Sequence, residues 1–239
     1  MMGIARTVVG LGLAALLAGC AGTLPTAVRQ EDQAKVQRIG VMSLLGNEFR
    51  GRAAATFSNT RYTAWDVADW QVDRRLAERT VAMLSVRKDF TAVVLDRTSL
   101  KDSPLSREIP PDVWTEAQAK GVDHVLLFRE SVNDNHRPIR PGYGLNELSI
   151  LGDLEKCVYL GYAVQFLDVQ SRKVVAWKSG WPRMCDRKDD DTDLALKDRR
   201  EDYSPQEQQQ LKERLWRRMD LTLAHSLDEL DLVPAAPTR

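Results

Sequence analysis

Compact apolar runs alternate with amphipathic segments in the first half of the chain, and this order restricts the possible folds most strongly. Residues 38–44, 90–95 and 122–128 have the composition of short buried strands. Residues 66–87 and 112–120 lie between them and carry apolar side chains at helical spacing. This alternation is typical of an α/β domain. We therefore expect a single layered α/β domain, with a mixed or mostly antiparallel sheet packed against helices on one side.

A long C-terminal helix is expected from residue 204 onward. Ser204 and Glu207 have the spacing of a capping box, and Pro205 stands at the first helical position. Apolar residues then recur at about every fourth position: Leu211, Leu215, Met219, Leu223, Leu227 and Leu230. This stripe is expected to pack in the core. The alternative is a structural subunit of an oligomer, with the stripe at the interface.

The second half of the domain is expected to contain a β-hairpin. Residues 133–153 are rich in Asn, Pro and Gly and are predicted to be a long loop. Apolar residues then occupy every second position of 158–166. A turn centred on 170–171 would place Phe166 opposite Val175, so that apolar side chains meet across the hairpin.

Two cysteines flank this hairpin. In the predicted register Cys157 faces Met184, and a bulge beside Pro182 would bring Cys185 opposite it. An even pair of cysteines in an exported protein is most simply a disulfide. Two buried thiols are the alternative. A metal site would need more ligands than the pair offers, and no histidine stands near either cysteine in the sequence.

The first residues have the layout of an export signal. A short head with one basic residue, Arg6, precedes an apolar run at 7–18 and a small-residue cleavage site. The run is too short to remain as a membrane-spanning helix, and no later apolar segment is long enough to be one. The chain holds 34 basic and 34 acidic residues, interleaved without a basic stripe. Nucleic acid is therefore not an expected partner.

The end of this signal, Leu17-Ala18-Gly19-Cys20, resembles the lipobox of bacterial lipoproteins. The resemblance implies cleavage before Cys20, a diacylglyceryl group on its sulfur and a further acyl chain, palmitate among them, on the new amino terminus. Several acyl chains hold a protein on a membrane where one is marginal. Ala21, in place of Asp, implies sorting to the outer membrane, with the domain in the periplasm. The alternative is an ordinary signal peptide cut near Ala21.

Three later stretches, 90–97, 121–126 and 164–169 with 173–177, are similar to stretches in a group of bacterial envelope proteins. That group includes the periplasmic domain of the curli secretion lipoprotein, the lipoprotein activators of penicillin-binding proteins and the amino-terminal domain of the TolB protein. The resemblance spans most of residues 38–230 and implies a fold, since such motifs carry no activity. The curli lipoprotein lends long hairpins to a pore. No pair of ten-residue alternating strands is expected here, which disfavours a channel.

Catalytic motifs are missing from the mature sequence, which has no nucleophile elbow, zinc-protease motif or phosphate-binding loop. The three histidines are scattered, at His124, His136 and His225. His124 falls within an apolar strand, where a core histidine is the simplest interpretation. No catalytic residue, cofactor or metal is therefore predicted.

An acidic run offers one metal alternative. Asp189, Asp191 and Asp193 match the first ligand positions of an EF-hand loop, but Leu194 and Arg200 replace its glycine and its bidentate glutamate. A solvated loop is the simpler interpretation.

These observations divide the chain into a signal peptide (1–19), a lipidated terminus and tether (20–36), an α/β domain (37–232) and a tail (233–239). The expected function is a lipid-anchored, non-enzymatic module that binds another envelope protein. The alternative is a periplasmic hydrolase or small-ligand-binding lipoprotein with its site in the loop at 133–153.

Overall fold

The structure is a computed structural model, which describes residues 25–55, 59–96, 108–130, 142–151, 153–179 and 193–233. The signal peptide, Cys20, Cys185 and the tail from residue 234 lie outside these ranges. The described strands are β1 (Arg38–Ser43), β2 (Glu48–Ala55), β3 (Arg61–Asp66), β4 (Thr91–Val94), β5 (His124–Glu130), β6 (Gly142–Ile150), β7 (Asp153–Asp168) and β8 (Lys173–Ser179). The helices are α1 (Gln30–Gln33), α2 (Val72–Leu84), α3 (Pro111–Ala119) and α4 (Pro205–Glu229), with short 3₁₀ turns at Ala68–Trp70 and Arg200–Asp202.

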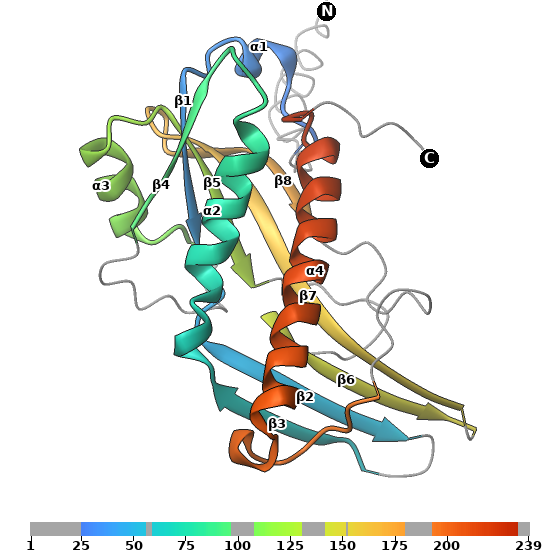
Figure 1. Cartoon of the computed structure of the whole chain (residues 1–239). Coiled ribbons are helices and arrows are strands. Elements are labelled where there is room, and N and C mark those ends of the chain that lie inside the picture. Colours follow the sequence, from blue (N-terminus) through green and yellow to red (C-terminus); the bar gives the residue numbers. More distant parts are fainter. Residues whose placement is uncertain are drawn as a thin grey trace, which may run out of the picture.

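The described strands form one mixed sheet of eight strands, in the order β3-β2-β6-β7-β5-β1-β4, with β8 also paired to β7 (Figure 1). β1 is parallel to β4 and β5, and β2 is parallel to β6, while the remaining pairs are antiparallel. This arrangement confirms the predicted α/β class, with a mixed sheet packed against helices and a long C-terminal helix.

β7 carries both parts of this sheet. Its residues 162–168 pair with β5, and its residues 153–161 pair with β6. At 16 residues, β7 extends well beyond the predicted 158–166. Its partner β6 has 9 residues and also pairs with β2, so this strand pair is used within the domain's own sheet.

β6 corrects the prediction of a loop over 133–153. Residues 142–150 form this strand, and residues 133–141 lie outside the described ranges. Gly142 and Gly144 indicated a turn because glycine is unfavourable within strands. In the structure, a Cβ at Gly144 would overlap the backbone of Arg50 on β2. The glycine is therefore required by close packing of two strands far apart in the sequence.

The β7–β8 hairpin has the predicted turn but a different register beyond it. Asp168 faces Lys173 as expected, and a bulge then places Phe166 opposite Ala176 instead of Val175. The bulge predicted beside Pro182 lies outside the described residues. Cys157 is buried on β7. Because Cys185 lies outside the described residues, the disulfide stays a prediction.

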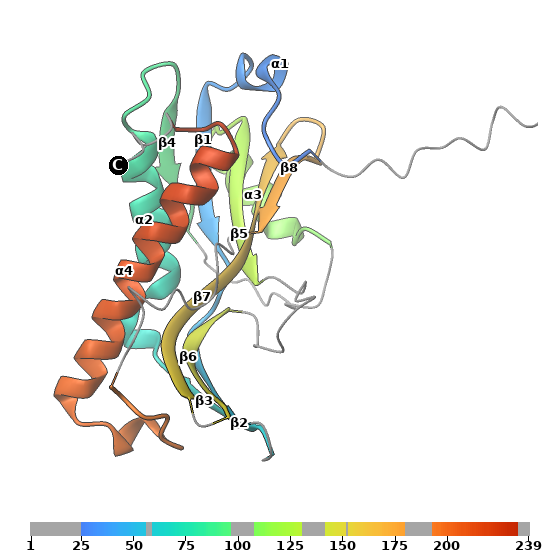
Figure 2. The ribbon, with the colours of Figure 1, turned by 90° about the vertical axis from the view of Figure 1, so that its right-hand side faces the viewer.

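The sheet has an apolar core on each face, and Figure 2 shows helices on both sides of its upper part. α2 and α4 cover the face that includes Leu126 and Phe128 of β5. The alternate residues Val125 and Leu127 pack with Trp114 of α3 in a second core. Helices therefore cover both faces, not one side as expected. The continuous apolar run of β5 follows from this arrangement, because a strand buried on both faces shows no alternation.

α4 confirms the predicted C-terminal helix and its position in the core. Every residue of the apolar stripe from Leu211 to Leu230 is at most 1% exposed. The helix contacts β7, where the Tyr162 hydroxyl and Ser226 Oγ lie 3.0 Å apart in a hydrogen bond. Burial of the stripe within the chain contradicts the alternative in which it forms an oligomer interface.

The capping box at the start of α4 is also confirmed. The Glu207 N–H donates to Ser204 Oγ at 3.3 Å, and the Ser204 N–H donates to the Glu207 carboxylate at 2.7 Å. The Lys197 ammonium lies 2.8 Å from the same carboxylate. These contacts, Lys197 first, lower the pKa of Glu207 from its ordinary 4.5 to about 2.

Replacing Glu207 with glutamine is expected to make stability less sensitive to acid. A carboxyl whose folded pKa lies below its unfolded value stabilises the fold above the unfolded pKa, and this stabilisation is lost as the pH falls through the folded pKa. For Glu207 that window runs from 4.5 down to about 2. Glutamine preserves the capping geometry without the charge. The urea midpoints of the wild type and E207Q at pH 6 and pH 3 check this. An equal decrease of the midpoint between pH 6 and pH 3 in the two proteins would contradict it.

Residues 25–36 belong to the domain and correct the predicted tether at 20–36. The Pro25 carbonyl accepts a hydrogen bond from the Trp177 N–H at 2.9 Å, and the Val28 N–H donates to the Leu230 carbonyl at 3.2 Å. Val28 and Val36 are buried in the core. Their isolated positions in a polar stretch gave no periodic signal. Only residues 20–24 remain as a connection. No helix in the described ranges is long and apolar enough to cross a membrane.

Candidate functional site

A polar cluster lies where α2 begins, at the carboxyl end of β1. The Asp73 carboxylate accepts hydrogen bonds from Ser43 Oγ at 2.6 Å and from the backbone N–H groups of Leu45 and Gly46 at 2.8 and 3.1 Å. A hollow of about 610 Å³ lies beside it, with Asp96 on its wall. Ligands often bind at this edge of an α/β sheet. Here, however, both oxygens of Asp73 are used to hold the β1–β2 connection in place.

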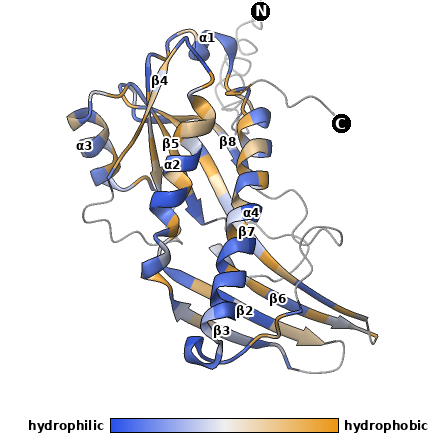
Figure 3. Cartoon of the chain, viewed as in Figure 1, coloured by the Kyte–Doolittle hydropathy of each residue, from blue (hydrophilic) through white to orange (hydrophobic). Residues whose placement is uncertain are grey.

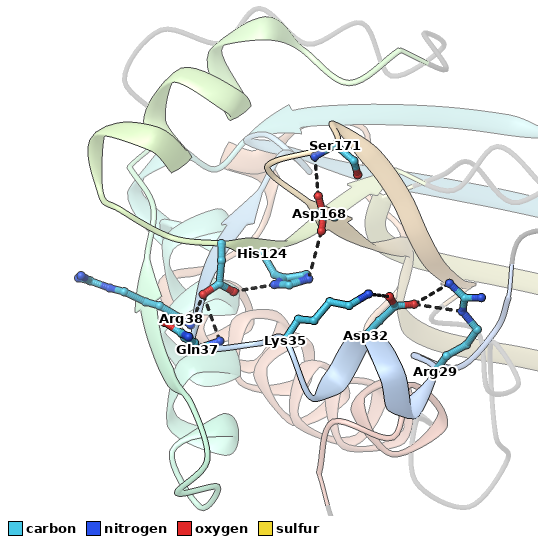
Figure 4. Close-up of polar contacts among 9 residues, drawn as sticks. Arg29, Asp32, Lys35, Gln37, Arg38, His124, Asp168 and Ser171 are labelled. Carbon is cyan, nitrogen blue, oxygen red and sulfur yellow. Dashed lines mark hydrogen bonds and ion pairs between the residues drawn. The ribbon is translucent and has the colours of Figure 1, made fainter.

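A second polar cluster surrounds His124 at the opposite end of β5 (Figure 4). The imidazole is 3% exposed and stacks on the Phe166 ring at 4.9 Å. Its Nδ1 lies 2.6 Å from an Asp123 oxygen, and its Nε2 lies 3.8 Å from an Asp168 oxygen. The other Asp123 oxygen accepts the backbone N–H groups that begin β1. This geometry fits the interpretation of His124 as a core histidine held on the sheet.

The surroundings of Asp168 keep that carboxylate charged. Desolvation raises its pKa, but the Ser171 N–H at 2.6 Å and the charges of His124 and Lys35 together hold the pKa below its ordinary value. A hollow of about 620 Å³ opens beside these groups and includes Arg172. The Ser171 hydrogen bond closes the β7–β8 turn, so this aspartate has a clear structural role.

The described residues bring the remaining candidates into no common site. His225 lies on α4, 3.2 Å from Glu229, and takes no part in the cluster around His124. Asp193 lies beside Arg214 and Arg217 of α4, while Asp189, Asp191 and His136 fall outside the described ranges. Within those ranges, no group of three His, Cys, Asp or Glu side chains could hold a metal ion. Cys20, the predicted lipidation position, and Cys185, half of the predicted disulfide, also lie outside them.

An exposed apolar tip at the β6–β7 hairpin is a feature that the sequence interpretation missed. Leu151 is 81% exposed and Leu154 is 54% exposed. Leu151 has a φ of +51°, which places it in the turn itself. Figure 3 shows apolar colouring at this end of the sheet, away from α1. Assigning the segment to a long loop hid the signal, which is two leucines, at positions 151 and 154, around a glycine.

Comparison with known proteins adds little. No family model and no curated protein matches the chain. Among solved structures, a dodecamer of a PelC point variant from Paraburkholderia phytofirmans is similar to this chain at 11% sequence identity, over 84% of this chain and 94% of that one, with a TM-score of 0.27. A likeness at that TM-score and identity supports no conclusion about what this chain does.

Proposed function

We propose that this chain is a lipid-anchored envelope protein that acts as a non-enzymatic, protein-binding or accessory module of a cell-envelope assembly. The lipobox at 17–20 supports the anchor, which would hold the domain on the periplasmic face of the outer membrane. The described domain begins at Pro25, five residues after the cysteine, so the anchor and the fold are closely connected.

The observation that carries the protein-binding role is the exposure of Leu151 and Leu154 at the hairpin tip. A single exposed leucine on a surface is ordinary, but apolar side chains grouped on a protruding element are typical of interaction sites. The tip lies at the end of the sheet away from α1 (Figure 1). An anchored domain would therefore present it to partners in the periplasm.

The two polar clusters also support a binding role over a catalytic one. Asp73 accepts three hydrogen bonds from its own domain, and Asp123 accepts two from the start of β1. A catalytic acid or base must instead reach a substrate atom. Both carboxylates are used to position the chain.

The double substitution L151S/L154S is expected to reduce capture of the partner about tenfold, since two buried anchors of a small interface contribute that much or more. A photo-crosslinking residue is placed at position 155, next to the tip, and the conjugates are measured in intact cells. The matched control is V86S/L221S, which removes two other exposed apolar side chains, 61% and 50% exposed. The control should crosslink like the wild type.

Equal crosslinking by wild type and L151S/L154S would contradict the role of the tip. Recovery of the bait alone, together with turnover of a cell-wall substrate by the purified protein, would favour the hydrolase alternative instead.

A further inference from the structure

The short connection to Cys20 restricts which part of the domain can face a membrane. The Pro25 carbonyl is fixed to the Trp177 N–H of β8 at 2.9 Å. Five residues precede it, and an extended chain spans at most roughly 3.6 Å per residue, so Cys20 lies within about 18 Å of this edge. α4 alone, with 25 residues, is about 37 Å long. The acyl chains would thus enter the bilayer near the end of the sheet that carries α1 and the β7–β8 turn.

Four exposed basic side chains lie at this same end. Arg38 begins β1, Lys88 lies in the α2–β4 turn, and Arg172 and Lys173 lie at the β7–β8 turn. Among the described residues, none of these four side chains forms an ion pair. Figure 4 shows the Arg38 side chain directed away from the His124 cluster. Their charges are therefore available to a surface outside the protein.

The acidic side chains of this end are mostly engaged within the protein. Asp32 lies 2.9 Å from Arg29 and 3.0 Å from Lys35. Glu31 pairs with Arg29, and Asp89 pairs with Arg87. Asp123 accepts hydrogen bonds from backbone N–H groups and contacts His124, and Asp168 accepts a hydrogen bond from the Ser171 N–H. Asp228 and Asp231 form no ion pair with a described residue, and of these two only Asp231 is fully exposed. The fully exposed side chains of this end that lack an ion pair to a described residue are thus four basic ones and one acidic one.

We infer that this end of the domain docks on anionic phospholipid headgroups, with Arg38, Lys88, Arg172 and Lys173 as the contacts. Basic side chains next to an anionic bilayer are attracted to it within a Debye length. The anchor keeps the domain at high effective concentration near the bilayer, so a few charges suffice to select one orientation. The inference rests on the proposed lipid anchor. It adds that the hairpin tip would point away from the bilayer.

Lysine labelling of the acylated mature protein tests this orientation. The protein is reconstituted into vesicles of phosphatidylcholine alone or with phosphatidylglycerol, and treated with an amine reagent that cannot cross membranes. Labelling of Lys88 and Lys173, measured by mass spectrometry, is expected to be about threefold slower on the anionic vesicles. About 0.5 M salt should abolish the difference, because it screens exposed charges. Lys212 of α4 should label equally on both vesicles.

The triple substitution R38Q/R172Q/K173Q keeps Lys88 as the reporter and should remove its protection. The matched control R74Q/K212Q/R217Q removes three basic side chains of α2 and α4 and should retain it. An acylated protein whose Lys88 labels equally on both vesicles, or is protected in both variants, would overturn the docking inference alone. Absence of acyl mass on Cys20 would overturn the proposed anchor and this inference together.

Discussion

Replacing Phe49 with alanine is expected to lower the free energy of unfolding by about 3–5 kcal/mol, because the substitution leaves a large cavity in a closed core. Phe49 is fully buried. Its ring stacks on Trp65 at 5.3 Å and meets Trp70 and Tyr143 edge-on at 5.4 and 6.2 Å. These partners come from β3, the 3₁₀ turn before α2, and β6. A single side chain thus connects the sheet to the start of a helix.

Urea denaturation measures this loss as a lower midpoint at an unchanged slope. Tyr62 on β3 provides the control, because it is 42% exposed and its replacement by alanine should cost less than about 0.5 kcal/mol. A variant F49A as stable as Y62A would show that this aromatic cluster does not hold the lower part of the sheet together.

Replacing Asp73 with alanine is expected to cost about 3 kcal/mol, since it leaves three donors without their acceptor and hydrogen bonds to a charged group are the stronger kind. D73N should cost less than D73A. Its remaining oxygen can still accept from Ser43 and Leu45, which share one oxygen of the aspartate, while Gly46 loses its acceptor. The ranking of the two variants therefore tests the hydrogen-bond geometry.

Hydrogen exchange shows where the effect acts. The amides of Leu45 and Gly46 should exchange faster in D73A while those of β7 keep their protection. E78Q on the exposed face of α2 is the control, because its salt bridge with Arg74 is solvent-exposed and of little value. A D73A protein as stable as E78Q would contradict the positioning role of Asp73.

The sequence predicts those parts of the fold whose signals are local. The capping box at Ser204 and the stripe along α4 depend on residues three or four positions apart, and both are confirmed. The α/β class likewise follows from periodicity within single segments. The turn of the β7–β8 hairpin is predicted for the same reason, since Asp168 and Lys173 lie close in the chain.

The features that escaped prediction depend on contacts between distant segments. Gly144 is typical of a turn until β2 is placed against it, and Val28 has no periodic apolar pattern around it although it packs near Leu230. Of the candidate site, the lipobox cysteine can be proposed from four consecutive residues. The exposed tip at Leu151 could not, because exposure depends on how far β6 and β7 extend beyond α4.

The hydrogen bond from the Val28 N–H to the Leu230 carbonyl can form only late in synthesis of the chain. About 200 residues separate the two partners, so at typical translation rates roughly 10 to 40 s pass between the appearance of one and of the other. Residues 25–36 cannot take their final place before the last turn of α4 has been made. The contacts of this amino-terminal segment therefore cannot be complete until nearly the whole domain has been synthesised.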